Sequence, residues 1–482
     1  MSKKYDVVIV GSGPAGIFSA YELINLKPDV KILVIDKGRD INSRSCPIRD
    51  NKTDHCVKCN PCHIMSGFGG AGAFSDCKLS LSAEGVGGCL SEYVGIEKAN
   101  KYVNLVDEIF SKFDNQKDNR KIIGKEITEE IEQIIDSCSK QVIKYTYCPT
   151  KHLGTDGTYN VMCNMQDYLI NRGVEFAFNT EVLNVKKVLD KDFTFEQEFI
   201  IETASSTDYL TNNIILAPGR SGNTWVKHIA ESLNIKTKNN KVDIGVRVET
   251  NAKITKKLTD NLYDVKLSYT NSSGDKVRMF CTNPNGFVSE EHYNISGKNI
   301  AIANGHSFAD KKSENTNFAL LVTLEDEKIT SDFIKGILEV YHNIYDGKLV
   351  IQNCVEFMSD SGYKTKIKNS DTKPTLNTAI FGDLNLILPT RVTNLIKTML
   401  IKLDSSVAKH IRWNDTWLYG IETKFYSDLI RVDENMQTDV LGIYCIGDGS
   451  GTTRGITQSA SEGLIAAQHI YKNISNKRCE GF

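Results

Sequence analysis

Several features are missing from this sequence of 482 residues, and each absence excludes a class of protein. No stretch approaches the roughly 20 consecutive apolar residues that a membrane helix needs, so we expect no membrane partner. The apolar run at residues 5–10 is too short for the core of a signal peptide and ends in glycine, which predicts a cytoplasmic protein. Because the net charge is −2 and no long basic run occurs, we expect no nucleic-acid partner.

Motifs of nucleophilic and metal-dependent hydrolases are missing as well. The sequence contains no P-loop, no HExxH helix and no recognisable nucleophilic triad. Hydrophobic residues make up 40% and charged residues 24%, as in an ordinary globular protein and unlike a disordered one. The chain is too long for one compact core, so two or three domains are expected.

The most informative segment that is present lies near the N-terminus. Residues 5–10 predict a buried parallel strand, and the glycines Gly11, Gly13 and Gly16 follow it. A helical pattern comes next, at 14–26. A second strand is predicted at 31–35, and it ends at Asp36. In a Rossmann βαβ unit these glycines allow the tight turn, the approach of a pyrophosphate and close helix packing, while the acid binds ribose hydroxyls. A lone glycine motif also fits a plain turn, but this complete order predicts a dinucleotide site.

Two further segments point to FAD rather than NAD as the dinucleotide. Residues 442–448 form an apolar strand that ends in Gly447 and Asp448, and a glycine-rich turn leads into a helix of small residues at about 456–471. Residues 213–219 form a second strand ending in Ala217, Pro218 and Gly219. Each segment alone fits a buried strand and turn. Taken together, they predict that both ends of the chain fold around one FAD.

These motifs resemble the FAD-binding members of the Rossmann superfamily that includes glutathione reductase and the aromatic-ring hydroxylases. The chain is more closely similar to a largely uncharacterised bacterial family of FAD-dependent dehydrogenases. The segments that carry the resemblance are residues 7–16, 67–76, 152–161, 216–222, 243–249, 381–389 and 442–463. The resemblance implies a flavin fold and redox chemistry but no particular substrate. One departure is Cys77, where glycine is usual: it is either a thiol near the flavin or a small buried thiol.

The resemblance also implies roles for individual residues. Asp448 would bond the ribityl chain, Arg454 would lie near the flavin pyrimidine, and backbone near Val182 would pair with the adenine. The complete set of predicted FAD-binding residues is Gly11, Gly13, Pro14, Ala15, Gly16, Asp36, Lys37, Gly69, Gly70, Ala71, Val182, Ala217, Gly219, Gly447, Asp448, Thr453, Arg454 and Gly455.

A cluster of four cysteines is the sharpest feature outside the flavin motifs. Cys46, Cys56, Cys59 and Cys62 follow the spacing C-x9-C-x2-C-x2-C. Four interpretations stay open: a [4Fe–4S] cluster exchanging electrons with flavin, a structural zinc, a redox-active dithiol, or ordinary reduced cysteines. The many cysteines of a cytosolic chain favour thiols or metal ligands over disulfides.

The predicted fold class is α/β, with a discontinuous Rossmann-type FAD-binding domain and an α+β substrate domain containing a mostly antiparallel sheet. We assign residues 1–222 and 431–482 to the FAD domain, with a helical hairpin inserted near 97–143, and residues 223–430 to the substrate domain. The substrate domain has no second strand–GxGxxG–helix unit, so NAD(P)H is expected only as a transient donor.

Two polar residues of the expected substrate domain are candidate catalytic groups. Arg247 lies in a predicted strand and would hold an acidic substrate group or form a structural ion pair. His306 would act as an acid or base near neutral pH, or would be a turn histidine without such a role.

The predicted function is transfer of a hydride or electrons between FAD and a small organic substrate. One alternative is an iron–sulfur flavoprotein that relays electrons to a redox protein partner. The other is an FAD-binding, RNA-associated protein, which the near-neutral charge disfavours.

Overall fold

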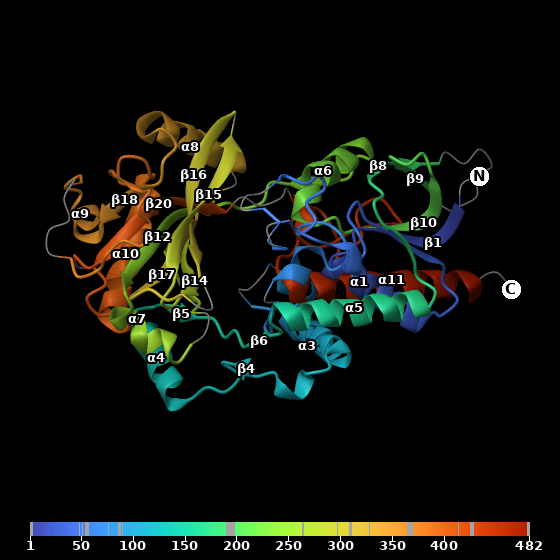
Figure 1. Cartoon of the computed structure of the whole chain (residues 1–482), viewed down its shortest axis with the longest axis horizontal. Helices are drawn as coiled ribbons and strands as arrows, with labels where there is room; N and C mark the ends of the chain where they lie inside the picture. The colour runs from blue at the N-terminus through green and yellow to red at the C-terminus, as the bar shows by residue number, and fades with distance from the viewer. Residues whose placement is uncertain are drawn as a thin grey trace. The chain divides into compact units, whose positions relative to one another are not determined.

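A computed structural model describes residues 3–47, 49–50, 52–53, 57–75, 77–84, 88, 90–188, 198–262, 265–295, 297–307, 311–326, 328–363, 370–412, 414–424 and 429–479 (Figure 1). The chain divides into two compact units. Unit 1 comprises residues 1–122, 149–238 and 427–482, and unit 2 comprises residues 123–148 and 239–426. Both units are therefore discontinuous in sequence.

Unit 1 is built on a seven-stranded sheet with the order β7-β2-β1-β10-β9-β8, in which β22 also pairs with β10. The pairs β7–β2, β2–β1, β1–β10 and β10–β22 are parallel, whereas β9 is antiparallel to both β8 and β10. The strands are β1 (Lys3–Val10), β2 (Ile32–Ile35), β7 (Glu175–Ala177), β8 (Val182–Lys187), β9 (Phe199–Thr203), β10 (Tyr209–Leu216) and β22 (Ile443–Cys445).

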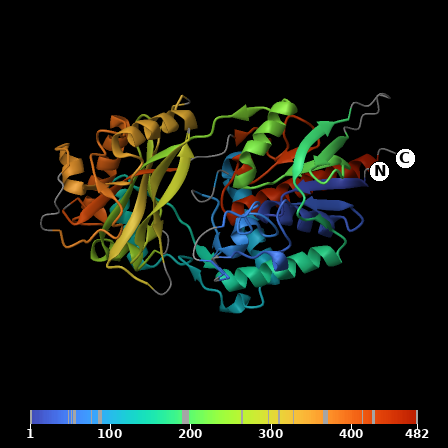
Figure 2. The same cartoon turned by 45° about the horizontal axis from the view of Figure 1, so that its top comes forward.

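Both faces of this sheet are buried under helices. Since alternate residues of a strand point to opposite sides, one strand contributes to the core on each face. Val7 and Ile9 of β1 join one apolar cluster, and Val8 and Val10 join another. The first cluster is covered by α1 (Pro14–Leu26), α3 (Ile96–Phe113), α5 (Thr155–Asn171) and α11 (Ile456–Cys479), and the second by α6 (Asn223–Ser232). Helices α1 and α11, from opposite ends of the chain, lie side by side (Figures 1 and 2).

Shorter elements complete unit 1. They are β3 (Lys78–Ser80), α2 (Leu90–Val94), β6 (Thr150–His152), β11 (Thr237–Lys238) and β21 (Leu429–Ile430), and β4 (Ile122–Ile123) lies where the chain passes into unit 2. In the described part of the chain, no helix combines the length and the apolar character that crossing a bilayer requires.

Unit 2 is built on an eight-stranded sheet with the order β19-β18-β20-β12-β17-β14-β13-β5. Among its described residues, neighbouring strands pair antiparallel, except that β18 and β19 run parallel. The strands are β5 (Lys144–Tyr145), β12 (Asp243–Asn251), β13 (Leu267–Thr270), β14 (Lys276–Asn283), β17 (Asn315–Thr323), β18 (Val350–Asn353), β19 (Ile380–Phe381) and β20 (Thr416–Lys424). The predicted combination of a Rossmann-type sheet and a mostly antiparallel sheet is confirmed.

Helices and a hairpin cover the sheet of unit 2. The hairpin pairs β15 (Phe287–Ile295) with β16 (Lys298–His306), and in Figure 1 it lies beside α8 (Ser331–Tyr345). The other helices are α4 (Glu129–Ser139), α7 (Ala252–Thr259), α9 (Cys354–Ser359) and α10 (Thr390–Ser406). All residues of β12 except Asn251 are buried, because α7, α10 and β16 pack against this central strand.

The structure corrects the predicted helical hairpin near residues 97–143. Helix α3 belongs to unit 1, whereas α4 belongs to unit 2, so the two helices are not one insertion in the FAD domain. The reason is that the apolar faces of the two helices pack in different cores. Val103 and Phe110 of α3 pack in the core around α1, and Ile131 and Ile134 of α4 pack in the core of the eight-stranded sheet. The unit boundaries also differ from the expected 222/223 and 430/431, since α6 packs within unit 1.

Candidate functional site

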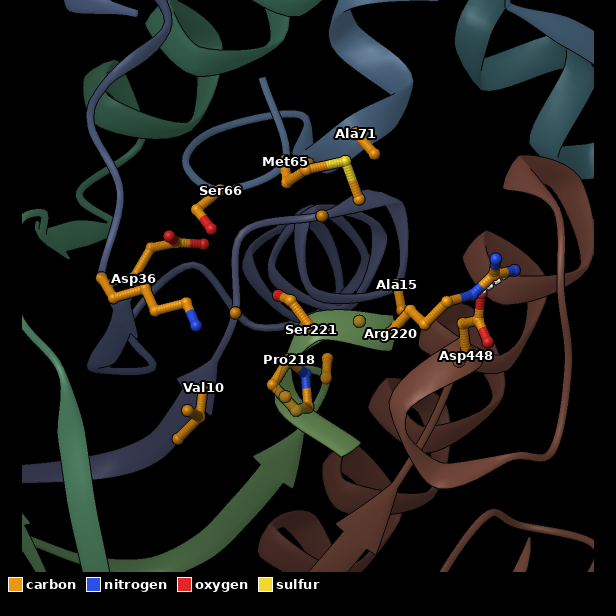
Figure 3. Close-up of a pocket in the computed structure, with 18 of the residues that line it drawn as sticks. Val10, Ala15, Asp36, Met65, Ser66, Ala71, Pro218, Arg220, Ser221 and Asp448 are labelled. Atoms are coloured by element: carbon orange, nitrogen blue, oxygen red, sulfur yellow. Dashed lines mark hydrogen bonds and ion pairs between the residues drawn. The ribbon is translucent and has the colours of Figure 1, made fainter. Parts of the chain in front are cut away.

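Unit 1 contains a cavity of about 720 Å³, within the roughly 300–1,000 Å³ of ligand pockets. Its described walls come from residues 10–37, 65–72, 180–182, 217–228 and 446–459. The three motifs that the sequence singled out therefore meet at one cavity. In Figure 3, Met65 and Ser66 lie on one side of it and Val10 and Pro218 on the other.

The turn between β1 and α1 needs glycine for two separate reasons. Gly11 has a φ of +106°, and a Cβ there would collide with the carbonyl oxygen of Ala217 on the turn after β10. A Cβ at Gly16 would collide with the carbonyl oxygen of Gly11, so this glycine lets α1 pack against the turn. These are the packing tasks expected of the first and third glycines.

Gly13 differs, because its backbone is extended with a φ of −76°, and among the described residues beyond its chain neighbours a Cβ there would meet only Gly70 Cα, at 4.0 Å. Gly70 approaches Gly13 closely as part of the second glycine loop, and both residues line the cavity. The open space beside Gly13, next to the N-terminus of α1, suits a pyrophosphate.

Asp36 is held at the end of β2 by three neutral donors. Its Oδ2 accepts hydrogen bonds from the Ser12 backbone N–H and from the Ser12 hydroxyl, both at 2.8 Å. Its Oδ1 accepts from the Gly38 N–H at 2.7 Å. The carboxylate is thereby fixed on the cavity wall, where ribose hydroxyls can donate to its remaining lone pairs.

Arg44 organises the loop that carries Met65, Ser66 and Gly67 to the cavity. Its buried guanidinium donates to the carbonyl oxygens of His63 at 2.9 Å, Ile64 at 2.6 Å and Phe68 at 2.5 Å. Burial lowers the pKa of Arg44 to about 10. The sequence did not single out this arginine, because its role depends on three carbonyl groups about 20 residues away.

The opposite wall of the cavity is the turn after β22. Asp448 on this turn forms an ion pair with Arg220, whose Nη2 lies 3.0 Å from Asp448 Oδ2 (Figure 3). A Cβ at Gly449 would come within 2.6 Å of the Gly219 carbonyl oxygen, so the two turns touch directly. Below the turn, the buried Glu462 of α11 accepts a hydrogen bond from the Gly447 N–H at 2.6 Å.

Helix α6 supplies cavity residues that sequence reasoning missed. Thr224, Trp225 and His228 line the cavity near Val182, and the Trp225 Nε1–H donates to the Leu183 carbonyl at 2.9 Å. The sequence prediction assigned residues 223–430, which include this helix, to the substrate domain. The apolar spacing of Val226, Ile229 and Ala230, which are buried in unit 1, could have located the helix but not its cavity-facing side.

Most predicted FAD-binding residues line the cavity: Gly11, Gly13, Pro14, Ala15, Asp36, Lys37, Gly70, Ala71, Val182, Ala217, Gly219, Gly447, Asp448 and Gly455. Gly16, Gly69, Thr453 and Arg454 are not among its described wall residues. Gly16 and Gly69 still shape the wall, since Gly69 has a φ of +83° and donates to the Ser12 carbonyl at 2.8 Å.

Cys77 is buried and has a φ of +45°, a conformation that suits the glycine usual at this position. It is not among the described residues that line the cavity. The structure therefore favours the small buried thiol over a thiol that faces the cavity.

Arg247 lies within unit 2, in a buried ion pair with Glu422. Nε donates to Glu422 Oε2 and Nη2 to Glu422 Oε1, both at 2.8 Å, and Nη1 donates to Asn317 Oδ1 at 2.9 Å. Since Arg247 is 0% exposed, a substrate acid cannot reach it, and the structural ion pair is the correct alternative. This placement corrects its candidacy as a catalytic residue.

His306 lies at the exposed end of β16 in unit 2. The preceding residue, Gly305, packs against the Arg247 guanidinium so closely that a Cβ would collide with Nη1. Arg247 and the residue before His306 are therefore in contact although the two candidates are 59 positions apart in sequence, and of the two candidates only His306 is exposed.

The cysteine cluster is only partly described, because Cys56 lies outside the described residues. Cys46 and Cys59 are half-buried and Cys62 is exposed, all as free thiols. Within the described ranges, no three cysteine, histidine or acidic side chains gather in a metal-binding arrangement. The described residues therefore give no support to the predicted iron–sulfur or zinc site.

Comparisons with known proteins agree with a flavin-binding chain. The model of a family described as "FAD-dependent protein, C-terminal domain-like" matches residues 241–425. A Clostridium beijerinckii protein, named only as uncharacterized, is 26% identical over 97% of this chain and 81% of its own length.

Two solved enzyme structures are distantly similar. Glycine oxidase from Geobacillus kaustophilus and L-proline dehydrogenase from P. horikoshii are each 11% identical over 98% of this chain and 95% of theirs, with TM-scores of 0.38 and 0.35. Likenesses this low decide neither activity nor substrate. The family match, in contrast, agrees with the predicted resemblance: residues 241–425 are similar to the C-terminal domain of a family of FAD-dependent proteins.

Proposed function

We propose that the protein is an FAD-dependent oxidoreductase that transfers a hydride or electrons between bound flavin and a small organic substrate. The observation that carries this proposal is the cavity of about 720 Å³ at which three distant motifs converge. The matching family of FAD-dependent proteins supports the same cofactor. The cytoplasmic location and the small-molecule substrate stay predictions from the sequence.

The residues around the cavity fit FAD. Open space beside Gly13 suits the pyrophosphate, and the Asp36 carboxylate has lone pairs left for the adenosine ribose. Val182 would place its backbone at the adenine, and Asp448 would bond the ribityl chain. When bound, FAD supplies two-electron redox chemistry, while the chain binds the coenzyme and fixes its orientation.

The catalytic role of the chain is expected to be orientation and charge stabilisation rather than covalent catalysis. With Arg247 committed to Glu422, His306 is the remaining sequence-derived candidate for proton transfer. The relay alternative, which needs an iron–sulfur centre, has no support from the described cysteines. A transient NAD(P)H donor stays a prediction from the sequence.

The decisive experiment is to purify the protein, record its visible spectrum and titrate the apoprotein with FAD. We expect flavin absorption or tight FAD binding in the wild type. In Gly13→Ala, the extended backbone accepts the new methyl without strain, so the fold should persist while FAD affinity falls by about tenfold or more through lost space at the pyrophosphate.

The matched control is Gly336→Ala, because Gly336 lies on α8 of unit 2 and a Cβ there would have no described atom within 4 Å. It should leave the affinity for FAD unchanged. A colourless wild-type protein that does not bind added FAD would refute the proposed function. Unaltered binding by Gly13→Ala would instead refute the assigned pyrophosphate position.

A further inference from the structure

The carboxylate of Glu462 is an unusual feature of the FAD-site architecture. This residue lies on α11 and is 0% exposed. No role was assigned to it from the sequence, because a single glutamate in a helix of small residues resembles any exposed helix position. The neighbouring Gly463 explains why Glu462 is so deeply buried. Gly463 lets α11 pack closely on α1, because a Cβ at this position would collide with the Ala15 carbonyl.

One oxygen of this carboxylate holds the whole turn that follows β22. Glu462 Oε2 accepts from the Gly447 N–H at 2.6 Å, the Thr452 hydroxyl at 2.9 Å and the Thr453 hydroxyl at 2.9 Å. These donors lie at the two ends of the turn, so a single acceptor closes it. The turn between them contains Asp448, which lines the cavity.

The other oxygen has the opposite environment. Glu462 Oε1 is buried and has no hydrogen-bond partner in the described part of the structure. Every donor on Oε2 is neutral, so burial dominates and raises the pKa of Glu462 to about 7, although the three hydrogen bonds lower it. A buried carboxylate with one unsatisfied oxygen is costly for stability alone, which points to a functional reason for its presence.

We propose that Glu462 is a positioning residue of the cofactor site, which fixes the turn at residues 447–453 so that Asp448 faces bound FAD. This inference rests on the proposed function, since it takes the cavity to hold FAD. Glu462 itself does not touch the coenzyme: it acts through the Gly447 backbone and the Thr452 and Thr453 hydroxyls.

Two substitutions with side chains about as long as that of Glu462 test whether the residue positions the turn or only fills space. Glu462→Met removes both oxygens, so the Gly447 N–H loses its acceptor, and we expect FAD to bind about tenfold more weakly or worse. Glu462→Gln keeps one acceptor oxygen for the turn, and we expect it to restore most of the affinity. Ser461→Ala is the matched control, because Ser461 is a buried neighbour on α11 whose hydroxyl donates to the Thr457 carbonyl of the same helix.

Titration of each apoprotein with FAD, together with its thermal unfolding, reads out both effects. A role confined to packing would lower Tm in the Met and Gln variants without separating their affinities for FAD, and this result would overturn the proposal. If Glu462→Met does not fold, Thr452→Val removes one donor from the turn and leaves α11 intact. That variant should weaken FAD binding by about threefold, and an unchanged affinity would also overturn the proposal.

The wild-type titration distinguishes the two proposals. A wild-type protein that does not bind FAD fails the proposed function itself. Binding by the wild type with equal affinities in the Met, Gln and Ala variants fails only the positioning role of Glu462.

Discussion

The fully buried Glu422 of unit 2 and the fully buried Glu462 of unit 1 are held in opposite ways. Glu422 on β20 of unit 2 receives two charge-assisted hydrogen bonds from Arg247 and is a buried ion pair within the sheet. Glu462 on α11 of unit 1 receives three hydrogen bonds from neutral groups and keeps one oxygen unpartnered among the described residues. The first arrangement satisfies its charge internally, and the second leaves its charge uncompensated.

This difference distinguishes the ion pair inside the sheet of unit 2 from the carboxylate beside the cavity of unit 1. Arg247 and Glu422 use their charged groups on each other and have none left for a ligand. Their ion pair therefore stabilises the pairing of β12 with β20. Burial alone would lower the pKa of Arg247, but the Glu422 carboxylate raises it above its ordinary value. A carboxylate solvated only by neutral donors can change its protonation state, and Glu462 lies directly under a turn that lines the cavity. Burial of a charged residue is therefore no evidence of catalysis until its partners are known.

The largest effect is expected from breaking the ion pair of unit 2. Arg247→Met removes both charge-assisted hydrogen bonds of the buried Glu422 and leaves it only the more distant Lys424, at 3.8 Å, so we expect the free energy of unfolding to fall by about 3–5 kcal/mol. Urea unfolding followed by circular dichroism measures this loss. The FAD affinity of whatever protein remains folded should match that of the wild type.

A double variant tests whether the loss comes from the orphaned charge. Arg247→Met with Glu422→Leu replaces both charges by apolar groups and should recover most of the stability. Failure of the double variant to recover would show that the geometry of the network with Asn317, rather than charge pairing, stabilises this part of the sheet.

The second-largest effect is the dependence of the free energy of unfolding on pH, to which we expect Glu462 to contribute. Burial raises its folded-state pKa from 4.5 to about 7, so the folded protein binds this proton more tightly than the unfolded chain does. The corresponding stability is fully present below about pH 4.5 and is lost as the pH rises through about 7. Between pH 5 and 8 we expect a loss on the order of 2 kcal/mol for the apoprotein.

Urea unfolding at both pH values checks this slope. In Glu462→Gln, which cannot ionise, the part of the pH dependence due to this group should disappear. The control is Glu325→Gln, whose carboxylate forms an exposed ion pair with Lys241 and should leave the slope as in the wild type. Identical pH profiles for wild type and Glu462→Gln would contradict an uncompensated buried carboxylate.

A third carboxylate, Asp36, extends the comparison because it too is held by neutral donors. Asn at this position keeps one acceptor oxygen, but its amide group would face either the Ser12 or the Gly38 N–H, donor against donor. We expect Asp36→Asn to weaken FAD binding by about tenfold, roughly 1.4 kcal/mol. Asp6→Asn is the control: Asp6 also accepts a backbone N–H, from Lys31, but lies outside the cavity.

The sequence was sufficient for those parts of the site whose chemistry is local. Glycines at 11, 13 and 16 act within one turn, and Asp36 follows its strand directly, so spacing alone located them. The order of motifs also predicted which segments meet, because parallel strands place their carboxyl ends at one edge of the sheet.

Contacts between distant segments were beyond such reasoning. The Arg44 guanidinium reaches three carbonyls of another loop, and Glu462 bonds a turn nine to fifteen residues earlier, so neither leaves a periodic or spaced pattern. The helical segments at 96–113 and 129–139 look alike in amphipathic pattern, yet they join different cores. An amphipathic pattern shows that a helix has an apolar face but does not determine which core that face packs against.

The smallest effect is expected at the ion pair that lies in the open, between Arg220 and Asp448. Their side chains are 65% and 24% exposed, so water screens the attraction that is strong in the buried pair of unit 2. Arg220→Ala should therefore change the free energy of unfolding by less than about 1 kcal/mol. A loss comparable with that of Arg247→Met, measured under the same urea conditions, would contradict the view that burial rather than charge pairing alone sets the cost of breaking an ion pair here.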